Sequence, residues 1–325
     1  MNNFKKIGLT ALAASLVSVS AQAGALTASG GASMTAEGYS GVGMDGGTGF
    51  TMGNSVTLSG SGETDGGITV SLSYELDNGS ANGTKSPFDN HSLTVSSETL
   101  GTLKLSGHGG SSAASALDTS AAGDIWDTFD GARANGVSGV AISDSSPGDN
   151  GIFYTLPSMM DDLTLNISYN PQASTARTAD SELGYSATYS GVDGLTASYG
   201  VTDVETGATG TSGDQTAWKL AYAYGPVTAT ASSTDYDVGT GSNDQTMTSM
   251  AVSYTVTDDF SLTYGTEEIE KGGDPTDAEY SIMKAAFTTG GMTITATMKD
   301  GENINHTTAT NEDMEYWSLG ASFAF

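Results

Sequence analysis

The chain of 325 residues contains no cysteine, and it has only 10 lysine and arginine residues against 38 aspartate and glutamate residues. Without cysteine there is no disulfide framework and no thiol chemistry, so packing and backbone hydrogen bonds alone must hold the fold. The formal net charge of −28 argues against nucleic acid as a partner, because the few cations cannot neutralise many phosphates.

Long apolar runs are also missing, since none approaches the roughly 20 residues that a membrane helix requires. An apolar stretch at residues 7–19 follows Lys5 and Lys6, and Ala21-Gln22-Ala23 supplies the small-x-small pattern that signal peptidase needs. We therefore expect residues 1–23 to be an export signal and residues 24–325 to form one domain. Losing Lys5 and Lys6 leaves 8 cations against 38 acids, a net charge of −30. If the exported chain sits in a membrane, it must cross as a barrel.

Catalytic and metal-binding motifs are absent as well. His91, His108 and His306 lie far apart, and there is no HExxH or Cys/His pattern, no GxSxG and no GxxxxGK. Residues 41–46 match GxGxxG formally, but they lie in a glycine-rich connection with no helix after it. We therefore expect no enzymatic activity and no cofactor.

What the sequence does contain is a repeated alternation of apolar and small polar residues, which is typical of a strand with one wet and one dry face. The alternating sets are Ile68, Val70, Leu72, Tyr74 and Leu76; Leu163, Leu165, Ile167 and Tyr169; Leu183, Tyr185, Ala187 and Tyr189; Leu195, Ala197, Tyr199 and Val201; Trp218, Leu220, Tyr222 and Tyr224; Met250, Val252 and Tyr254; Phe260, Leu262 and Tyr264; and Met292, Ile294, Ala296 and Met298.

The connections between these segments alternate in length. Short ones carry tight-turn residues, at 65–67, 191–194, 225–226, 257–259 and 290–291. Long ones, at 77–90, 171–180, 203–214 and 300–311, are polar and acidic. Short turns at one end and long loops at the other are typical of a transmembrane barrel.

Counting segments from residue 25 onwards predicts sixteen strands, with about 19 residues for each strand and its connection, which suits membrane strands of about 9 to 11 residues. The predicted fold is all-β, an antiparallel up-and-down transmembrane barrel with long external loops. A secreted acidic β-rich adhesin or surface-layer protein remains the alternative, and it would bury the aromatic-rich face in a core.

The C-terminal strand carries a family resemblance. Trp317, Leu319, Ala321, Phe323 and Phe325 share one parity and end on a terminal phenylalanine. This resembles the strand by which outer-membrane barrels are recognised by the barrel assembly machinery, so Phe323 and Phe325 are the expected assembly signal. The mature chain as a whole resembles the general diffusion porins of α-proteobacterial type, trimeric channels of the outer membrane for small hydrophilic solutes and ions. Residues 150–157, an Asn followed by an aromatic stretch and a Pro, are similar to the sixth strand of that family.

The resemblance implies a constriction loop after the fifth strand, and residues 108–150 occupy that position without any alternating pattern. We expect Ile125, Trp126 and Phe129 to anchor the loop against the inner wall. The acidic side chains expected at the constriction are Asp118, Asp124, Asp127 and Asp130, and the only loop cation is Arg133.

The scarce lysines complete the expected site. Lys104, Lys219 and Lys299 fall on the lumen parity of their strands, and Lys284 does so if Met283 faces lipid, although Tyr280 and Ile282 would then point inward. An acidic loop facing basic wall residues would set a transverse field across the narrowest point. Chance placement of the lysines on a polar face and a solvated acidic loop are the plainer interpretations.

The resemblance also implies the partners. The family forms homotrimers through its early and last strands, and the small outward residues Ala28, Gly30 and Ala32 fit such a contact. Outer-membrane lipids and lipopolysaccharide would surround the barrel, and loop carboxylates would suit Ca²⁺ or Mg²⁺, although no loop has an EF-hand spacing. The net charge predicts mild cation selectivity, screened beyond about 8 to 10 Å. A substrate-specific channel of the same architecture remains open.

Overall fold

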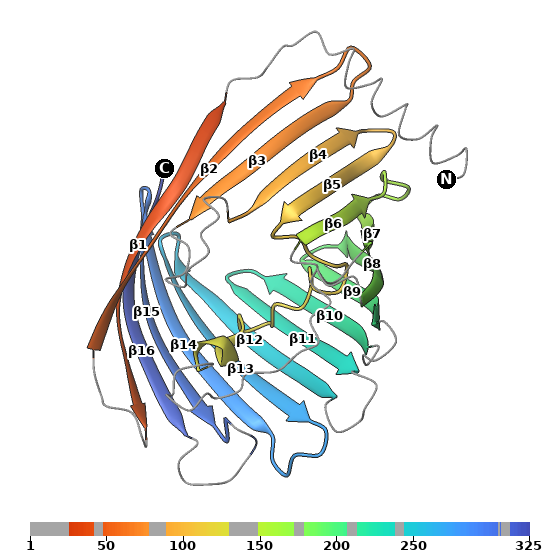
Figure 1. Ribbon diagram of the computed structural model, residues 1–325. Coiled ribbons are helices and arrows are strands. Elements are labelled where there is room, and N and C mark those ends of the chain that lie inside the picture. The colour runs from red at the N-terminus through yellow and green to blue at the C-terminus, as the bar shows by residue number, and fades with distance from the viewer. Residues whose placement is uncertain are drawn as a thin grey trace.

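The computed structural model describes residues 26–41, 48–77, 89–129, 149–171, 179–206, 213–237, 244–304, 306 and 313–325. The export signal expected at residues 1–23 lies outside these ranges. Within them the chain forms sixteen strands and one short 3-10 helix, η1 (Figure 1). Their bounds are β1 Thr27–Gly41, β2 Thr48–Glu63, β3 Thr69–Asp77, β4 His91–Ser97, β5 Gly101–His108, η1 Ile125–Thr128, β6 Asp149–Thr155, β7 Leu163–Asn170, β8 Ala179–Val192, β9 Leu195–Thr206, β10 Gly213–Tyr224, β11 Val227–Asp237, β12 Gln245–Thr257, β13 Phe260–Lys271, β14 Ala278–Thr289, β15 Met292–Glu302 and β16 Met314–Ala324.

Each strand pairs antiparallel with its neighbours in sequence, and β1 pairs with β16 to close the barrel. The closing register runs from Gly31 opposite Ala324 to Gly41 opposite Met314. The predicted sixteen-stranded up-and-down barrel is therefore confirmed. Closure gives every strand a hydrogen-bonded neighbour on both sides. The backbone N–H and C=O groups that an open sheet edge would expose are therefore paired.

Short turns occur at one end of the barrel. The start of β1 and the end of β16 lie at the same end. All five of the turns predicted from glycine, proline and aspartate are found, at residues 64–68, 193–194, 225–226, 258–259 and 290–291. Gly194 and Gly290 have φ values of 74° and 58°, the left-handed region that two-residue hairpin turns require and that side chains disfavour. Local sequence therefore determines where these hairpins reverse.

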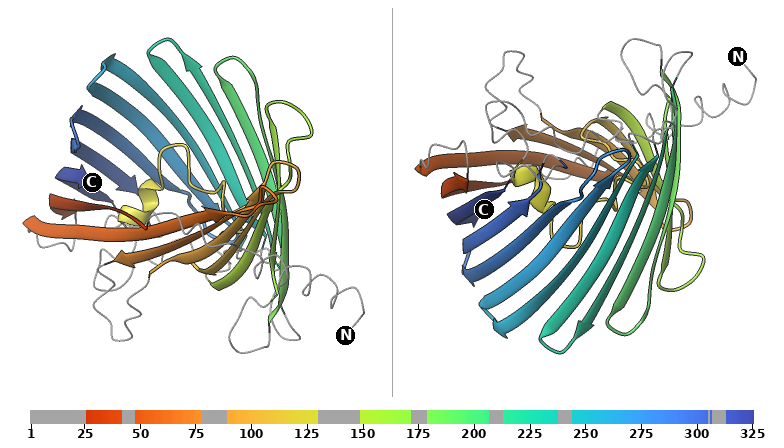
Figure 2. Two further views of the ribbon diagram at one scale, coloured as in Figure 1. Left: turned by 90° about the horizontal axis from the view of Figure 1, so that it is seen from above. Right: turned by 90° about the horizontal axis from the view of Figure 1, so that it is seen from below.

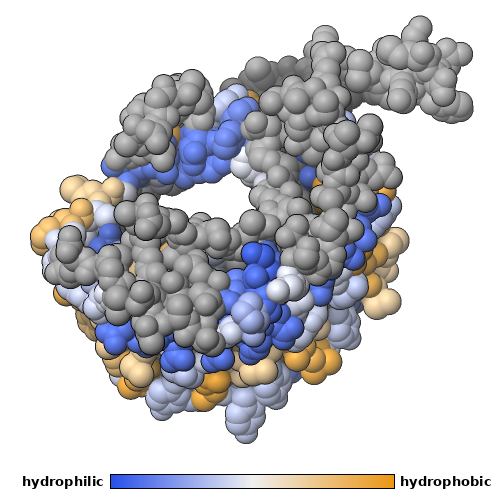
Figure 3. Space-filling view, turned by 60° about the horizontal axis from the view of Figure 1, so that its bottom comes forward, coloured by the Kyte–Doolittle hydropathy of each residue, from blue (hydrophilic) through white to orange (hydrophobic). Residues whose placement is uncertain are grey.

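The outer face of the barrel is apolar. Along β10, Trp218, Leu220 and Tyr222 are each more than 40% exposed and point outward, whereas Lys219 and Ala221 point into the lumen. Exposed aromatic side chains gather at the short-turn end, among them Tyr224, Tyr254, Phe287 and Phe323. Figure 3 shows hydrophobic residues on the outer surface and mostly hydrophilic described residues around the opening into the barrel. None of the helical residues in the described ranges forms a segment long and apolar enough to span a membrane.

The buried apolar residues lie inside the barrel and not between two sheets. Ile125 and Phe129 of the segment between β5 and β6 pack with Met247, Ile269 and Tyr280 of the inner wall, and the first two are fully buried. Figure 2 shows η1 and the segment before it within the ring of strands. The core therefore fixes a loop against the inner wall of the barrel.

Candidate functional site

The segment after β5 runs along the inner wall from β7 towards β15. Its backbone amides donate to wall side chains in strand order: Ala113 to Ser168 on β7, Ala114 to Thr202 on β9, Ala121 to Ser232 on β11, Ala122 to Ser249 on β12 and Trp126 to Glu267 on β13. These bonds are 2.8, 3.1, 2.7, 3.0 and 3.0 Å long. The segment thus satisfies these backbone amides on four hydroxyls and one carboxylate of the wall.

Apolar side chains also hold the segment on the wall at η1. Ile125 and Phe129 insert among residues of β12, β13, β14 and β16, and the rings of Phe129 and Tyr280 stack at 5.7 Å. Trp126 packs at the edge of this cluster. The expectation that Ile125, Trp126 and Phe129 anchor the loop is therefore confirmed.

The same cluster resolves the ambiguous parity of β14. Tyr280 and Ile282 are 6% and 7% exposed because they point inward against the loop, whereas Met283 is 60% exposed and points outward. Lys284 therefore faces the lumen. The alternation of apolar and polar residues does not identify the orientation of this strand. Tyr280 and Ile282 are apolar residues on its lumen side, and they pack against the loop.

Two of the four wall lysines bind the loop itself. Lys219 Nζ donates to the carbonyl oxygen of Thr119 at 2.9 Å, and Lys299 Nζ donates to the hydroxyl of Thr128. Their charges consequently lie behind the acidic segment and not across the lumen from it. Lys104, on β5, is exposed on the lumen parity and lies outside the wall on which the loop rests.

The loop acids differ in their surroundings. Asp118 accepts hydrogen bonds from Gln215 at 3.0 Å and from Tyr236 at 3.4 Å, so it is fixed to the wall. Asp127 is exposed. Asp124 accepts the Ser120 amide at 2.8 Å. Burial raises the pKa of the Asp124 carboxyl above its usual range, and nearby Asp127 acts in the same direction, while the Ser120 hydrogen bonds and Lys219 lower it. Asp130 and Arg133 lie outside the described residues.

The wall opposite the loop is a hydroxyl surface that sequence analysis did not single out. On β1 to β5 the lumen parity is rich in serine and threonine and also carries Glu37, Glu63, Glu75 and Asp77, and Lys104 is the only cation on these strands. Tyr39 of β1 reaches the end of the loop, where its hydroxyl donates to the Thr128 carbonyl at 3.1 Å. The residues that line its two recesses include Ser33, Ser55, Ser59, Ser61, Ser71, Ser73, Ser92 and Thr94. The alternation of Ser and Thr with apolar residues is the sequence signal for this surface, because it places the hydroxyls on the lumen face of each strand.

A closed barrel with a wet lumen, an apolar exterior and an inward loop is the geometry of a channel. The sequence model of the Gram-negative porin family matches residues 8–284. The chain belongs to this family. A search of curated protein sequences gives no significant match.

Solved porins share the fold at low sequence identity. The anion-selective porin from Comamonas acidovorans aligns with a TM-score of 0.68 and 14% identity, over 93% of this chain and 99% of its own. A triple mutant of the porin of Rhodopseudomonas blastica aligns with a TM-score of 0.63 and 17% identity, over 93% of this chain and 100% of its own. The protein is therefore a porin of the outer membrane, a channel for passive diffusion. Nothing in the fold or the family supports the alternative of a secreted adhesin.

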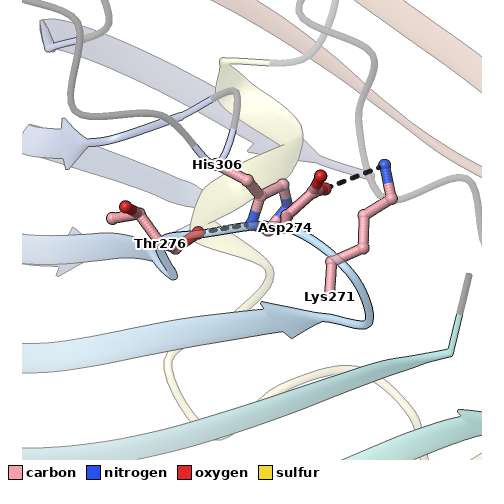
Figure 4. Close-up of polar contacts among 4 residues, drawn as sticks. All are labelled: Lys271, Asp274, Thr276 and His306. Carbon is pink, nitrogen blue, oxygen red and sulfur yellow. Dashed lines mark hydrogen bonds and ion pairs between the residues drawn. The ribbon is translucent and has the colours of Figure 1, made fainter. Parts of the chain in front are cut away.

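In a porin of this architecture the short turns face the periplasm and the long loops face outward. One external contact joins two loops (Figure 4): His306, after β15, donates from Nδ1 to the Thr276 carbonyl at 3.2 Å, and Lys271 pairs with Asp274 at 3.3 Å. Burial lowers the pKa of His306, and Lys271 adds to this, while the Thr276 hydrogen bond, Asp274 and Asp277 raise it.

The lowered pKa of His306 predicts that the contact between the two loops is sensitive to acid. The folded state binds the proton less readily than the unfolded state, whose histidine pKa is about 6.5. The contact is therefore weakened progressively as the pH falls below about 6.5. We expect amide exchange at residues 272–277 to accelerate below that pH in the wild type and to lose this dependence in His306→Gln. Equal pH dependence in both proteins would contradict the assignment.

The C-terminus closes the barrel seam. The Gly30 amide donates to the Phe325 carbonyl and the Phe325 amide donates to the Gly30 carbonyl, each at 3.0 Å. The side chains of Phe323 and Phe325 are 53% and 72% exposed. Their role as an assembly signal stays a prediction, and the exposure leaves both rings accessible at the end of the last strand.

Proposed function

We propose that this porin prefers cations and small neutral hydrophilic solutes, and that residues 109–129 form one side of its narrowest region. The supporting observation is the charge distribution of the described lumen. Asp124 and Asp127 lie on the loop, and Glu75 and Asp77 lie on the facing wall. Two of the lysines, Lys219 and Lys299, are hydrogen-bonded to the loop.

This distribution changes the expected electrostatics of the pore. A strong transverse field requires opposite charges on opposite sides of the lumen. Here the loop and the facing wall both carry carboxylates, and Lys104 is the only cation on the facing strands β1 to β5. We therefore infer a negative potential on both sides, which raises the local concentration of cations and imposes little orientation on dipolar solutes.

The reversal potential in a salt gradient tests this proposal. Refolded protein in a planar bilayer, with KCl at different concentrations on the two sides, should give the sign of a cation-preferring pore. Lowering the ionic strength should increase the preference, because screening weakens. A reversal potential of the opposite sign would overturn the proposal and leave the porin fold unaffected.

The raised pKa of Asp124 adds a pH dependence to the preference. A group whose pKa is raised takes up its proton at a higher pH than an ordinary aspartate, whose pKa is about 3.9. We expect cation preference to begin to fall above that pH during acidification, and Asp124→Asn to remove this first part of the decline. The asparagine keeps an oxygen for the Ser120 amide, so the loop retains its turn.

We propose that the porin assembles as a homotrimer through β1, β2 and β16. The outward residues of β1 are small at Ala28, Gly30 and Ala32, while Phe50 and Met52 of β2 are 74% and 70% exposed. Small residues let neighbouring walls approach, and the exposed apolar side chains provide area to bury. Conductance that appears in groups of three steps would support the trimer.

We also propose that external carboxylates bind Ca²⁺ or Mg²⁺ and thereby lipopolysaccharide phosphates. At the loop end of the outer face, Asp214 pairs in register with Asp203 and Asp237, and Glu279 pairs with Glu268 and Glu302. Like charges directly opposite destabilise a sheet, so a bridging cation would stabilise these pairs.

A compact group at this end suits such an ion. Glu268, Glu270 and Asp277 each place a carboxylate oxygen within 4.8 Å of the others. We expect Ca²⁺ to raise the thermal stability of the refolded porin, and the substitution of all three by Asn or Gln to abolish most of this gain. An equal gain in both proteins would contradict the site.

A further inference from the structure

The constriction loop lies against the wall with almost no space between them. Ala113 and Ala114 are fully buried on the loop side. On the wall side the facing positions are glycines: Gly184 on β8, Gly200 on β9 and Gly265 on β13. At these three glycines the loop contacts the backbone of the sheet directly. A larger residue at any of them would hold the loop away from the wall.

Adding one carbon atom at these positions shows how close the approach is. A Cβ at Gly200 would lie 2.8 Å from the Ala113 carbonyl oxygen and 3.1 Å from Cδ1 of Leu117. A Cβ at Gly265 would lie 2.7 Å from the Cβ of Ala122. Carbon atoms in contact are usually 3.5 to 4.0 Å apart, so either substitution must move the loop or the strand.

The hydrogen bonds determine which of the two moves. The strands are fixed by ladders on both sides, since Gly265 pairs with Ala251 and Ile282. The loop is held near Gly265 by the bond from the Ala122 amide to the Ser249 hydroxyl, 3.0 Å long, and by the bond from the Ala121 amide to Ser232. Two single bonds to side-chain hydroxyls yield before a barrel ladder does, so the loop should move into the lumen.

We propose that Gly200 and Gly265 are positioning residues that set the width of the pore by letting the constriction loop lie flush on the wall. This rests on the proposed role of residues 109–129 at the narrowest region. Neither glycine lines the open path, and each acts through the loop residue that covers it. Larger residues at these two positions would give a narrower channel with the same lumen charges.

The test adds a Cβ on the wall in one variant and, in a second variant, also removes the Cβ that faces it on the loop. Gly265→Ala should lower single-channel conductance by roughly 1.5-fold, because the loop shifts towards the lumen. Combining it with Ala122→Gly removes the opposing Cβ and should restore most of the lost conductance. Gly49→Ala on β2 is the matched control, since no atom lies within 4 Å of the added carbon and conductance should not change.

A second readout separates narrowing from altered charge. The reversal potential should be the same in wild type, Gly265→Ala and the double variant, because no charged group changes. Folding of each variant is checked by its heat-dependent mobility on denaturing gels. If Gly265→Ala does not fold, Gly200→Ala repeats the conductance measurement at the other contact, where the added carbon meets the Ala113 carbonyl oxygen and conductance should again fall.

The outcomes are distinguishable. Unchanged conductance in folded Gly265→Ala, or no recovery in the double variant, would overturn this inference. If complete replacement of the loop also left conductance unchanged, the loop would not be the constriction, and the proposed function of the loop would fail with it. If conductance rises on loop replacement but does not change in Gly265→Ala, only the positioning role of the glycines is overturned.

Discussion

Replacing residues 112–146 with a short glycine and serine link is expected to raise single-channel conductance at least about twofold, because the described part of this segment occupies the lumen. The barrel itself should tolerate the change. His108 and Asp149 are opposite each other in the register of β5 and β6, so a tight turn can join the two strands. The measurement is single-channel conductance in a planar bilayer at high salt.

An external connection provides the control for this replacement. Exchanging residues 207–212, between β9 and β10, for the same link should leave conductance nearly unchanged. Wild-type conductance in a correctly folded chain that lacks residues 112–146 would show that the loop does not limit the pore. The loss should also reduce cation preference, since Asp118, Asp124 and Asp127 are removed together.

Leu220→Arg is expected to destabilise the barrel by about 2 to 4 kcal/mol, because it places a charge on the lipid face near the middle of the apolar row of β10. Leu220 points outward with 41% exposure, between Trp218 and Tyr222. The measurement is the free energy of unfolding by denaturant in lipid vesicles.

The next residue of the same strand is the matched control. Ala221→Arg puts the same side chain on the lumen face, where water solvates the charge, and should cost much less than Leu220→Arg. It should instead change ion selectivity towards anions. Equal destabilisation by the two substitutions would contradict the assignment of the outer face to lipid.

The barrel was predictable because its determinants are local. Alternation of apolar and polar residues identifies strands, and glycine at positions such as Gly194 and Gly290 identifies turns that need a positive φ. Counting these segments along the chain gave the number of sixteen strands. The strand β14 was the exception, since Tyr280 and Ile282 break the alternation in order to pack against Phe129 of the loop.

The path of the loop was not predictable in the same way. Its anchors Ile125, Trp126 and Phe129 were recognisable as apolar residues in an acidic segment, but their partners are distant in sequence. The hydroxyl acceptors Ser168, Thr202, Ser232 and Ser249 resemble the many other lumen serines and threonines, so only their position identifies them. For the same reason the sequence placed Lys219 and Lys299 across from the loop, whereas they bind it from behind.

Disulfide trapping tests the central claim, that the segment after β5 lies on the β7 to β15 wall inside the lumen. The chain has no native cysteine, so no native thiol competes with an introduced pair. The Ala121 amide is 2.7 Å from the Ser232 hydroxyl, so the loop lies directly against the wall at this position. Ala121→Cys with Ser232→Cys should cross-link on mild oxidation of the folded porin, whereas Ala121→Cys with Ser73→Cys, on the facing wall, should not. Cross-linking of the second pair and not the first would contradict the account.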